Sequence, residues 1–175
     1  MIENLIFAYE KLYRRWIPLL IGLPLVIMTV VVFLNALGRK LLAPFPGTVE
    51  LVEALLVVSV YFGVALVAQE RGHVNVTFAT DALGYRKRYF IEGLGHVLAA
   101  CAFGYLAVAA WFAAADSVRI WEYRLAVYRF PLWPFKCLFA LGLSLLALQL
   151  VVNAVKDFHF AAGRKAYAGS YPVGA

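Results

Sequence analysis

Charged residues are scarce in this chain. Asp, Glu, Lys and Arg make up 15% of its 175 residues, whereas hydrophobic residues make up 64%. Soluble domains contain about 25% charged and about 45 to 50% apolar residues, so this composition excludes an ordinary soluble domain. The mean hydropathy of +0.81 agrees with that exclusion. The chain is therefore expected to be an integral membrane protein, with too few residues outside its apolar runs for a separate soluble domain.

Residues that carry enzymatic or metal chemistry are also few. The sequence has three histidines and two cysteines, and neither Cys101 nor Cys137 has a second ligand at metal spacing. No serine accompanies a His and an Asp in a hydrolase-like pattern, and no glycine-rich phosphate loop is present. The sequence therefore predicts no enzymatic activity, no cofactor and no metal site.

The chain lacks a continuous basic patch, although its net charge is +6. Lys and Arg lie at the ends of the apolar runs, which excludes a nucleic-acid surface and is typical of the positive-inside rule. Ten of the 16 Lys and Arg residues fall at the N-terminus, between the second and third runs, or at the C-terminus. Both termini are therefore predicted to be cytoplasmic.

Four long apolar runs predict an all-α membrane protein with four spans. Each run has enough residues to cross about 30 Å of hydrocarbon at about 1.5 Å per residue. Residues 1–158 are expected to form one membrane domain and residues 159–175 a loose tail. The predicted spans are residues 16–38, 50–69, 93–115 and 134–155.

Two polar-faced segments outside the spans predict amphipathic helices that lie in the membrane interface. Apolar residues recur at helical spacing within residues 1–15, against charged residues on the other face. The connection between the second and third spans, residues 74–92, shows a similar pattern and contains three consecutive basic residues.

Glu50 and Glu53 open the second span and lie on one helix face, because their spacing is that of helical neighbours. Charge at membrane depth costs roughly 2.5 to 3.5 kcal/mol, so Glu53 is expected to face protein rather than lipid. Arg39, at the end of the first span, is the expected partner of Glu50. The carboxylates could instead form a proton or cation relay. A structural role is favoured, because only Ser59 and Tyr61 are polar between Glu53 and Gln69.

Two other functions remain open on the residues alone. His73 and His96 lie near the same ends of adjacent spans and could ligate one haem iron in a four-span electron carrier. The chain could also be a stand-alone small channel or exporter. A visible haem spectrum, flux through the isolated chain, or a co-purifying large subunit would distinguish these functions.

The order of several motifs resembles the small membrane subunit of TRAP transporters (tripartite ATP-independent periplasmic transporters; DctQ-like). Arg39 is followed by a proline-rich turn and Glu50. The run Arg71-Gly72-His73-Val74 follows the second span, and Pro131-Leu132-Trp133-Pro134 precedes the last one. The likeness covers residues 10–155 and includes Gly63, Ala65 and Val76. It departs from the family pattern at Val49 and Thr77, where relatives often carry acidic residues.

The resemblance implies a non-catalytic subunit that scaffolds a large, multi-span membrane subunit in the inner membrane of a bacterium or the cell membrane of an archaeon. In the family, the large subunit carries the substrate and sodium sites, and a periplasmic binding protein delivers an organic acid. The resemblance thus implies sodium-coupled symport of an organic acid, with the large subunit, the binding protein and the bilayer as partners. The residues expected to act at subunit interfaces or in structure are Arg39, Glu50, Glu53, Arg71, His73 and His96.

Overall fold

The computed structural model describes residues 2–41, 46–69, 85–125 and 129–162. Within these ranges four helices are long and apolar enough to cross a membrane. They are α1 (Ile2–Leu41), α2 (Thr48–Gln69), α4 (Tyr85–Arg119) and α5 (Trp133–Ala161). The predicted all-α, four-span fold is thereby confirmed, and each predicted span lies inside one of these helices.

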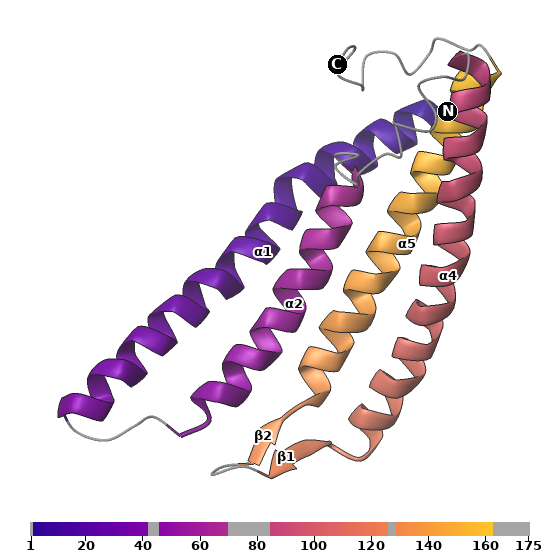
Figure 1. The fold of residues 1–175 in the computed structure, drawn as a ribbon. Coiled ribbons are helices and arrows are strands. Elements are labelled where there is room, and N and C mark those ends of the chain that lie inside the picture. The colour runs from indigo at the N-terminus through magenta and orange to yellow at the C-terminus, as the bar shows by residue number, and fades with distance from the viewer. Residues whose placement is uncertain (1, 42–45, 70–84, 126–128, 163–175) are drawn as a thin grey trace.

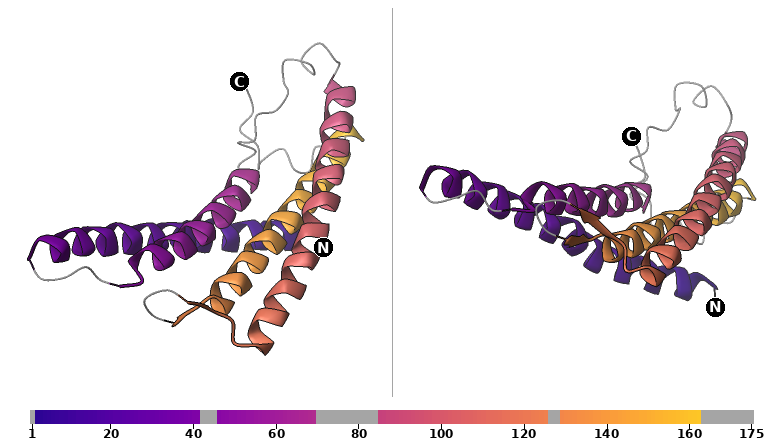
Figure 2. Two further views of the ribbon diagram at one scale, coloured as in Figure 1. Left: turned by 60° about the horizontal axis from the view of Figure 1, so that its bottom comes forward. Right: turned by 90° about the horizontal axis from the view of Figure 1, so that it is seen from below.

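The helices lie side by side in the order α1, α2, α5, α4 (Figure 1). The principal contacts join each helix to its neighbours in this row, with α2 and α5 in the interior. The C-terminal end of α1 diverges from the other helices, as two further views show (Figure 2). The large apolar side chains along that half of α1 are mostly exposed. The arrangement is therefore an open layer rather than a closed four-helix bundle.

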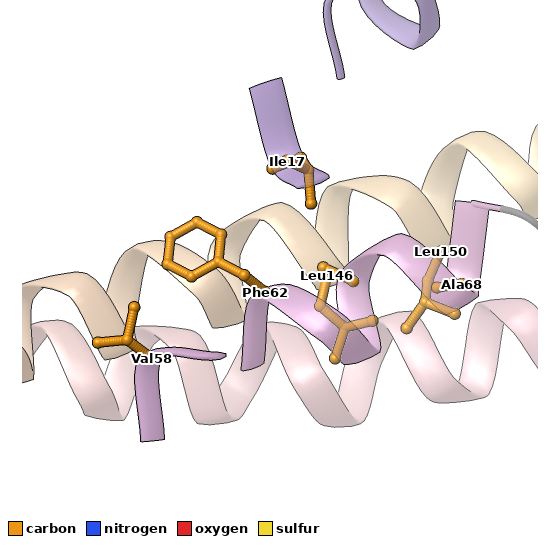
Figure 3. Close-up of a cluster of buried hydrophobic side chains, with 7 residues drawn as sticks. Ile17, Val58, Phe62, Ala68, Leu146 and Leu150 are labelled. Atoms are coloured by element: carbon orange, nitrogen blue, oxygen red, sulfur yellow. The ribbon is translucent and has the colours of Figure 1, made fainter. Parts of the chain in front are cut away.

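Two clusters of buried apolar side chains hold the row together. The first cluster joins α1, α2 and α5 (Figure 3). The second joins α4 to α5 through alanines spaced three and four residues apart, which is the spacing of one helix face. Small residues allow helices to approach closely in a membrane. The first cluster comprises Ile17, Val58, Phe62, Ala65, Ala68, Leu146 and Leu150, and the second comprises Ala107, Ala110, Ala114, Ala140 and Leu143.

The glycine that brings α2 and α5 together is Gly142. A Cβ atom added there would lie 3.2 Å from the Cβ of Tyr61 and 3.6 Å from its backbone carbon. Gly104, by contrast, faces open space, with nothing within 4 Å of an added Cβ. Close approach in this layer therefore depends on Gly142 and the alanine face of α4 rather than on Gly104.

Some structural details differ from the sequence predictions. The N-terminal amphipathic segment is continuous with the first span in α1, and its predicted position in the interface stays a prediction. Residues 85–92 of the second predicted interfacial helix form the beginning of α4, while residues 74–84 lie outside the described part of the chain. Helix α5 runs to Ala161, so residues 159–161 of the predicted tail are helical, and residues 163–175 lie outside the description.

A short two-stranded ribbon connects α4 to α5 and was not predicted. Strand β1 (Tyr123–Leu125) pairs antiparallel with β2 (Arg129–Pro131), with Arg124 opposite Phe130. Pro131 stands at the end of β2, where a missing amide donor is tolerated. The ribbon lies at the same end of the molecule as the beginning of α2 (Figure 1).

Candidate functional site

A polar cluster centred on Glu122 joins α4 to α5. Trp121 has a left-handed φ of 49°, and the Glu122 amide donates a hydrogen bond to the Ser117 carbonyl at 2.9 Å. These features end α4 in a Schellman motif. The Glu122 carboxylate accepts hydrogen bonds from the Lys136 ammonium and the Ser117 hydroxyl. Lys136 first, and then Ser117, hold the pKa of Glu122 below its ordinary value, because both stabilise the charged form.

The β1–β2 ribbon is held by aromatic and ionic contacts. The Arg129 guanidinium carbon lies 5.1 Å from the centre of the Tyr123 ring, within the range of a cation–π contact. Phe130 stacks on Phe135 of α5 with ring centres 5.5 Å apart. These contacts fix the ribbon against the first turn of α5.

The same ribbon reaches α2 through one ion pair. Arg124 Nη1 donates to Glu53 Oε2 at 2.7 Å, and both side chains are more than half exposed. An exposed pair of this kind typically contributes about 0.2 to 1 kcal/mol. Its main structural consequence is to connect the two helical hairpins, α1–α2 and α4–α5, at their shared end.

A pocket of about 390 Å³ lies between α2, the ribbon and α5. Its charged residues come from the first two turns of α2, the first turn of α5 and the ribbon, and its other residues are apolar or aromatic. Tyr61 and Phe139 meet edge to face at 4.5 Å in its lining. The lining residues are Glu50, Glu53, Ala54, Val57, Tyr61, Arg124, Leu132, Phe135, Lys136 and Phe139.

A buried polar seam runs along the other end of α5. Gln149, Asn153 and Asp157 are spaced four residues apart on one helix face and are at most 2% exposed. Gln149 Nε2 donates to Asn153 Oδ1 at 3.1 Å, and Asn153 Nδ2 donates to the carbonyl of Ala68 in α2 at 2.6 Å. Asp157 Oδ2 lies 2.8 Å from Nδ1 of His96 in α4. The seam therefore ties α5 to both of its neighbours.

The sequence-predicted residues fall in different places. No ion pair joins Arg39 to Glu50 among the residues described, and that pairing stays a prediction. Arg39 is exposed on the last turn of α1, at its diverging end. Glu50 and Glu53 both line the pocket, and Glu53 pairs with Arg124. His96 belongs to the buried seam. Arg71 and His73 lie outside the described residues.

Sequence reasoning missed most of the polar residues that join the helices. Gln149, Asn153 and Asp157 were available as a signal, since three polar residues at four-residue spacing interrupt the last apolar stretch on one face. Glu122 and Lys136 gave no comparable local signal, because their contact depends on how the ribbon folds back.

The described contacts of the site are packing contacts, hydrogen bonds and ion pairs between the helices and the ribbon. In the described ranges, no group of three or more His, Cys, Asp or Glu residues could hold a metal ion. The charged contacts lie toward the two ends of the layer, while Val58, Phe62 and Ala140 occupy positions between them. One neutral hydrogen bond, from Trp111 Nε1 of α4 to Ser144 Oγ of α5 at 2.9 Å, also lies between them.

A comparison with protein families gave a match over most of the chain. The model described as "Tripartite ATP-independent periplasmic transporters, DctQ component" matches residues 28–160. No curated protein matched the chain. The family match covers more than half of the sequence and spans α2, α4 and nearly all of α5, together with the end of α1. The chain therefore belongs to the DctQ family and is the small membrane component of a TRAP transporter.

Proposed function

We propose that this chain is a non-catalytic scaffold for the large membrane subunit of its transporter. The large subunit would carry the substrate and sodium sites, and a periplasmic binding protein would deliver an organic acid to it. The complex would reside in the bacterial inner membrane, with both termini of this chain in the cytoplasm. The charge distribution and the family membership support these assignments.

The open layer is the observation that carries the proposal. The polar groups of Asn153, Asp157 and Glu122 make contacts within the chain, so they join its own helices. The exposed flanks, by contrast, are predominantly apolar, above all along α1 and α4. Such flanks suit packing against another membrane protein, where van der Waals contacts drive helix association. Another membrane protein could thus pack on these flanks without breaking the hydrogen bonds and ion pairs that join the helices of this chain.

The depth of the polar seam favours a scaffold over a channel. From Gln149 to Asp157 the seam extends about 12 Å along α5, less than half of a hydrocarbon core of about 30 Å. At the other end, Glu53 and Arg124 neutralise each other at the surface. The apolar cluster around Phe62 and Leu146 separates these two regions. This separation supports a role in which substrate and cations cross through another subunit.

Reconstitution with the large subunit and its binding protein tests the proposal. Replacing Glu53 with Leu removes the partner of Arg124, and we expect weaker assembly of the two membrane subunits. Any complex that still forms should keep its apparent substrate affinity. Asp116→Asn is the matched control, because Asp116 is an exposed carboxylate at the same end and lies outside the pocket. Intact assembly combined with a changed cation dependence of uptake would place Glu53 on the transport path and overturn the scaffold role.

Cysteine labelling tests the orientation. After replacement of Cys101 and Cys137, single cysteines at positions 46 and 86 would report the two ends of the layer. A membrane-impermeant reagent added from the periplasmic side should modify position 46 and leave position 86 unmodified. The reverse pattern would invert the proposed topology.

A further inference from the structure

We propose that the pocket between α2, the ribbon and α5 binds a phospholipid whose headgroup carries a primary ammonium and a phosphate, as phosphatidylethanolamine does. The proposal depends on the pocket's own residues and not on the scaffold role. It assigns a ligand class to a cavity of about 390 Å³ that includes Glu50, Glu53, Arg124 and Lys136.

The charges around the pocket favour a ligand with a cationic group. Arg124 is paired with Glu53, and Lys136 is paired with Glu122. Glu50, which is half-buried, takes part in no ion pair within the described ranges. An incoming ammonium would therefore give the Glu50 carboxylate an ion-pair partner by donating hydrogen bonds to it. Arg124 and Lys136 keep further N–H donors for a phosphate, because a guanidinium has five and an ammonium three.

The distribution of polarity with depth matches an amphipathic ligand. Glu50 and Lys136 stand in the first turns of α2 and α5, at one end of the layer. From Glu50 to Tyr61 the lining descends about 16 Å along α2 and becomes apolar and aromatic. A headgroup at the charged rim would place its acyl chains beside Val57 and Phe139. The gradient therefore runs from headgroup depth into the hydrocarbon region.

The geometry favours a lipid over a helix of a partner protein. A docked helix requires a groove that continues along the layer, as in helix-in-groove recognition. Here α2 and α5 approach each other closely at Tyr61, the deepest α2 residue of the lining, because a Cβ added at Gly142 would lie 3.2 Å from the Tyr61 Cβ. This close approach leaves no room for a helix to continue between α2 and α5 past Tyr61.

Native mass spectrometry of the full chain tests this proposal. The protein, delipidated in detergent, would be titrated separately with phosphatidylethanolamine, phosphatidylcholine and phosphatidylglycerol. We expect the first lipid to be retained about tenfold better than the other two, because a quaternary ammonium lacks N–H donors and a glycerol headgroup lacks the cation. A hydrogen bond to a charged group is strong enough to change retention about tenfold.

Two variants with matched controls locate the site. Glu50→Gln should lower phosphatidylethanolamine retention about tenfold, whereas Asp116→Asn should leave it unchanged. Val57→Phe should block the apolar part of the pocket, whereas Val108→Phe, at an exposed site on α4 outside the lining, should not. Circular dichroism and thermal melting would establish that each variant is folded.

Three outcomes would overturn the proposal. Equal retention of all three lipids would show that the headgroup is not recognised. Unchanged retention in folded Glu50→Gln and Val57→Phe would place the lipid elsewhere. Loss of the lipid when the large subunit is added would identify a protein segment as the occupant. Assembly with the large subunit is measured separately, so the scaffold role can hold while the lipid site fails.

Discussion

The side-chain amide of Asn153 in α5 donates a hydrogen bond to the backbone carbonyl of Ala68 in α2, at 2.6 Å and away from the surface. Ala68 is the penultimate residue of α2, and the last four carbonyls of a helix have no intrahelical amide partner. Asn153 thus provides from another helix the bond that the end of α2 lacks.

Replacing Asn153 with Leu should destabilise the chain by about 1 to 3 kcal/mol, because the Ala68 carbonyl and the Gln149 amide would each lose a buried partner. Thermal unfolding of the purified chain in detergent would measure the loss. Thr29→Val is the control, since Thr29 is exposed and bonds only to the Leu25 carbonyl of its own helix among the described contacts. An equal loss of stability for the two substitutions would show that the Asn153 hydrogen bond contributes no more to stability than the exposed Thr29 bond does.

The contact between His96 and Asp157 should appear as a coupling energy in a double-mutant cycle. His96→Leu, Asp157→Leu and the combined variant would be compared by unfolding in detergent. Contacting residues usually couple by about 0.5 to 3 kcal/mol, so the combined loss should be smaller than the sum of the single losses. Simple additivity would mean that the two side chains do not interact in solution.

Acid should weaken the connection between α4 and α5 through Glu122. The folded chain lowers the pKa of this carboxyl from its ordinary 4.5. Its contribution to stability is therefore complete above pH 4.5 and is lost as the pH falls through the lower folded-state value. The melting temperature of the unmodified chain should fall as the pH is lowered from about 6 to about 3. The melting temperature of Glu122→Gln should fall less over the same range, because this variant has no carboxyl to protonate at that position.

The control for Glu122 is Asp116→Asn. Asp116 is exposed and lies 3.7 Å from Arg119, so its ion pair contributes little. This variant should keep the acid sensitivity of the unmodified chain. If Asp116→Asn flattened the curve as much as Glu122→Gln does, the decline would come from general charge rather than from the Glu122 cluster.

Gly142→Ala should destabilise the layer, and Gly104→Ala should not. The new Cβ at position 142 would press on the Cβ and backbone of Tyr61, which cannot move away without shifting α2. Overpacking of this kind costs about 1 to 3 kcal/mol and outweighs the helix preference of alanine. At position 104 alanine meets nothing and should gain about 0.5 to 1 kcal/mol. Unfolding of both variants in detergent would compare them, and a stabilising Gly142→Ala would contradict the close α2–α5 packing.

The sequence predicted the four spans because their signal is local: an uncharged run of sufficient length must be helical where no water can satisfy its backbone. The tertiary pairs are not local. Glu53 meets Arg124 at a separation of 71 residues, and Asn153 meets Ala68 at 85. Periodicity gives the face on which a residue lies but not the element opposite, which is why the contact between Glu53 and Arg124 was not predicted.

The β1–β2 ribbon was not predicted either, because it depends on side-chain contacts that the sequence pattern does not indicate. The segment from Arg124 to Pro134 contains two prolines and several aromatic residues, a composition typical of a turn at the membrane surface. Its strands are only three residues long, too short for alternation to be recognised. The pairing of Arg124 with Phe130 depends on the contacts of Phe130 and Arg129 with neighbouring rings.

The order of helices in the row has a consequence for how the chain is assembled during synthesis. The α1–α2 hairpin makes its contacts between consecutive helices, so it can form in the membrane before α4 leaves the ribosome. The α4–α5 hairpin is likewise complete in itself. The two halves join chiefly along α2 and α5. The hydrogen bond from Asn153 to the Ala68 carbonyl can therefore form only after α5 has been synthesised. Insertion of α5, the fourth span, is the step that joins the two hairpins into one subunit.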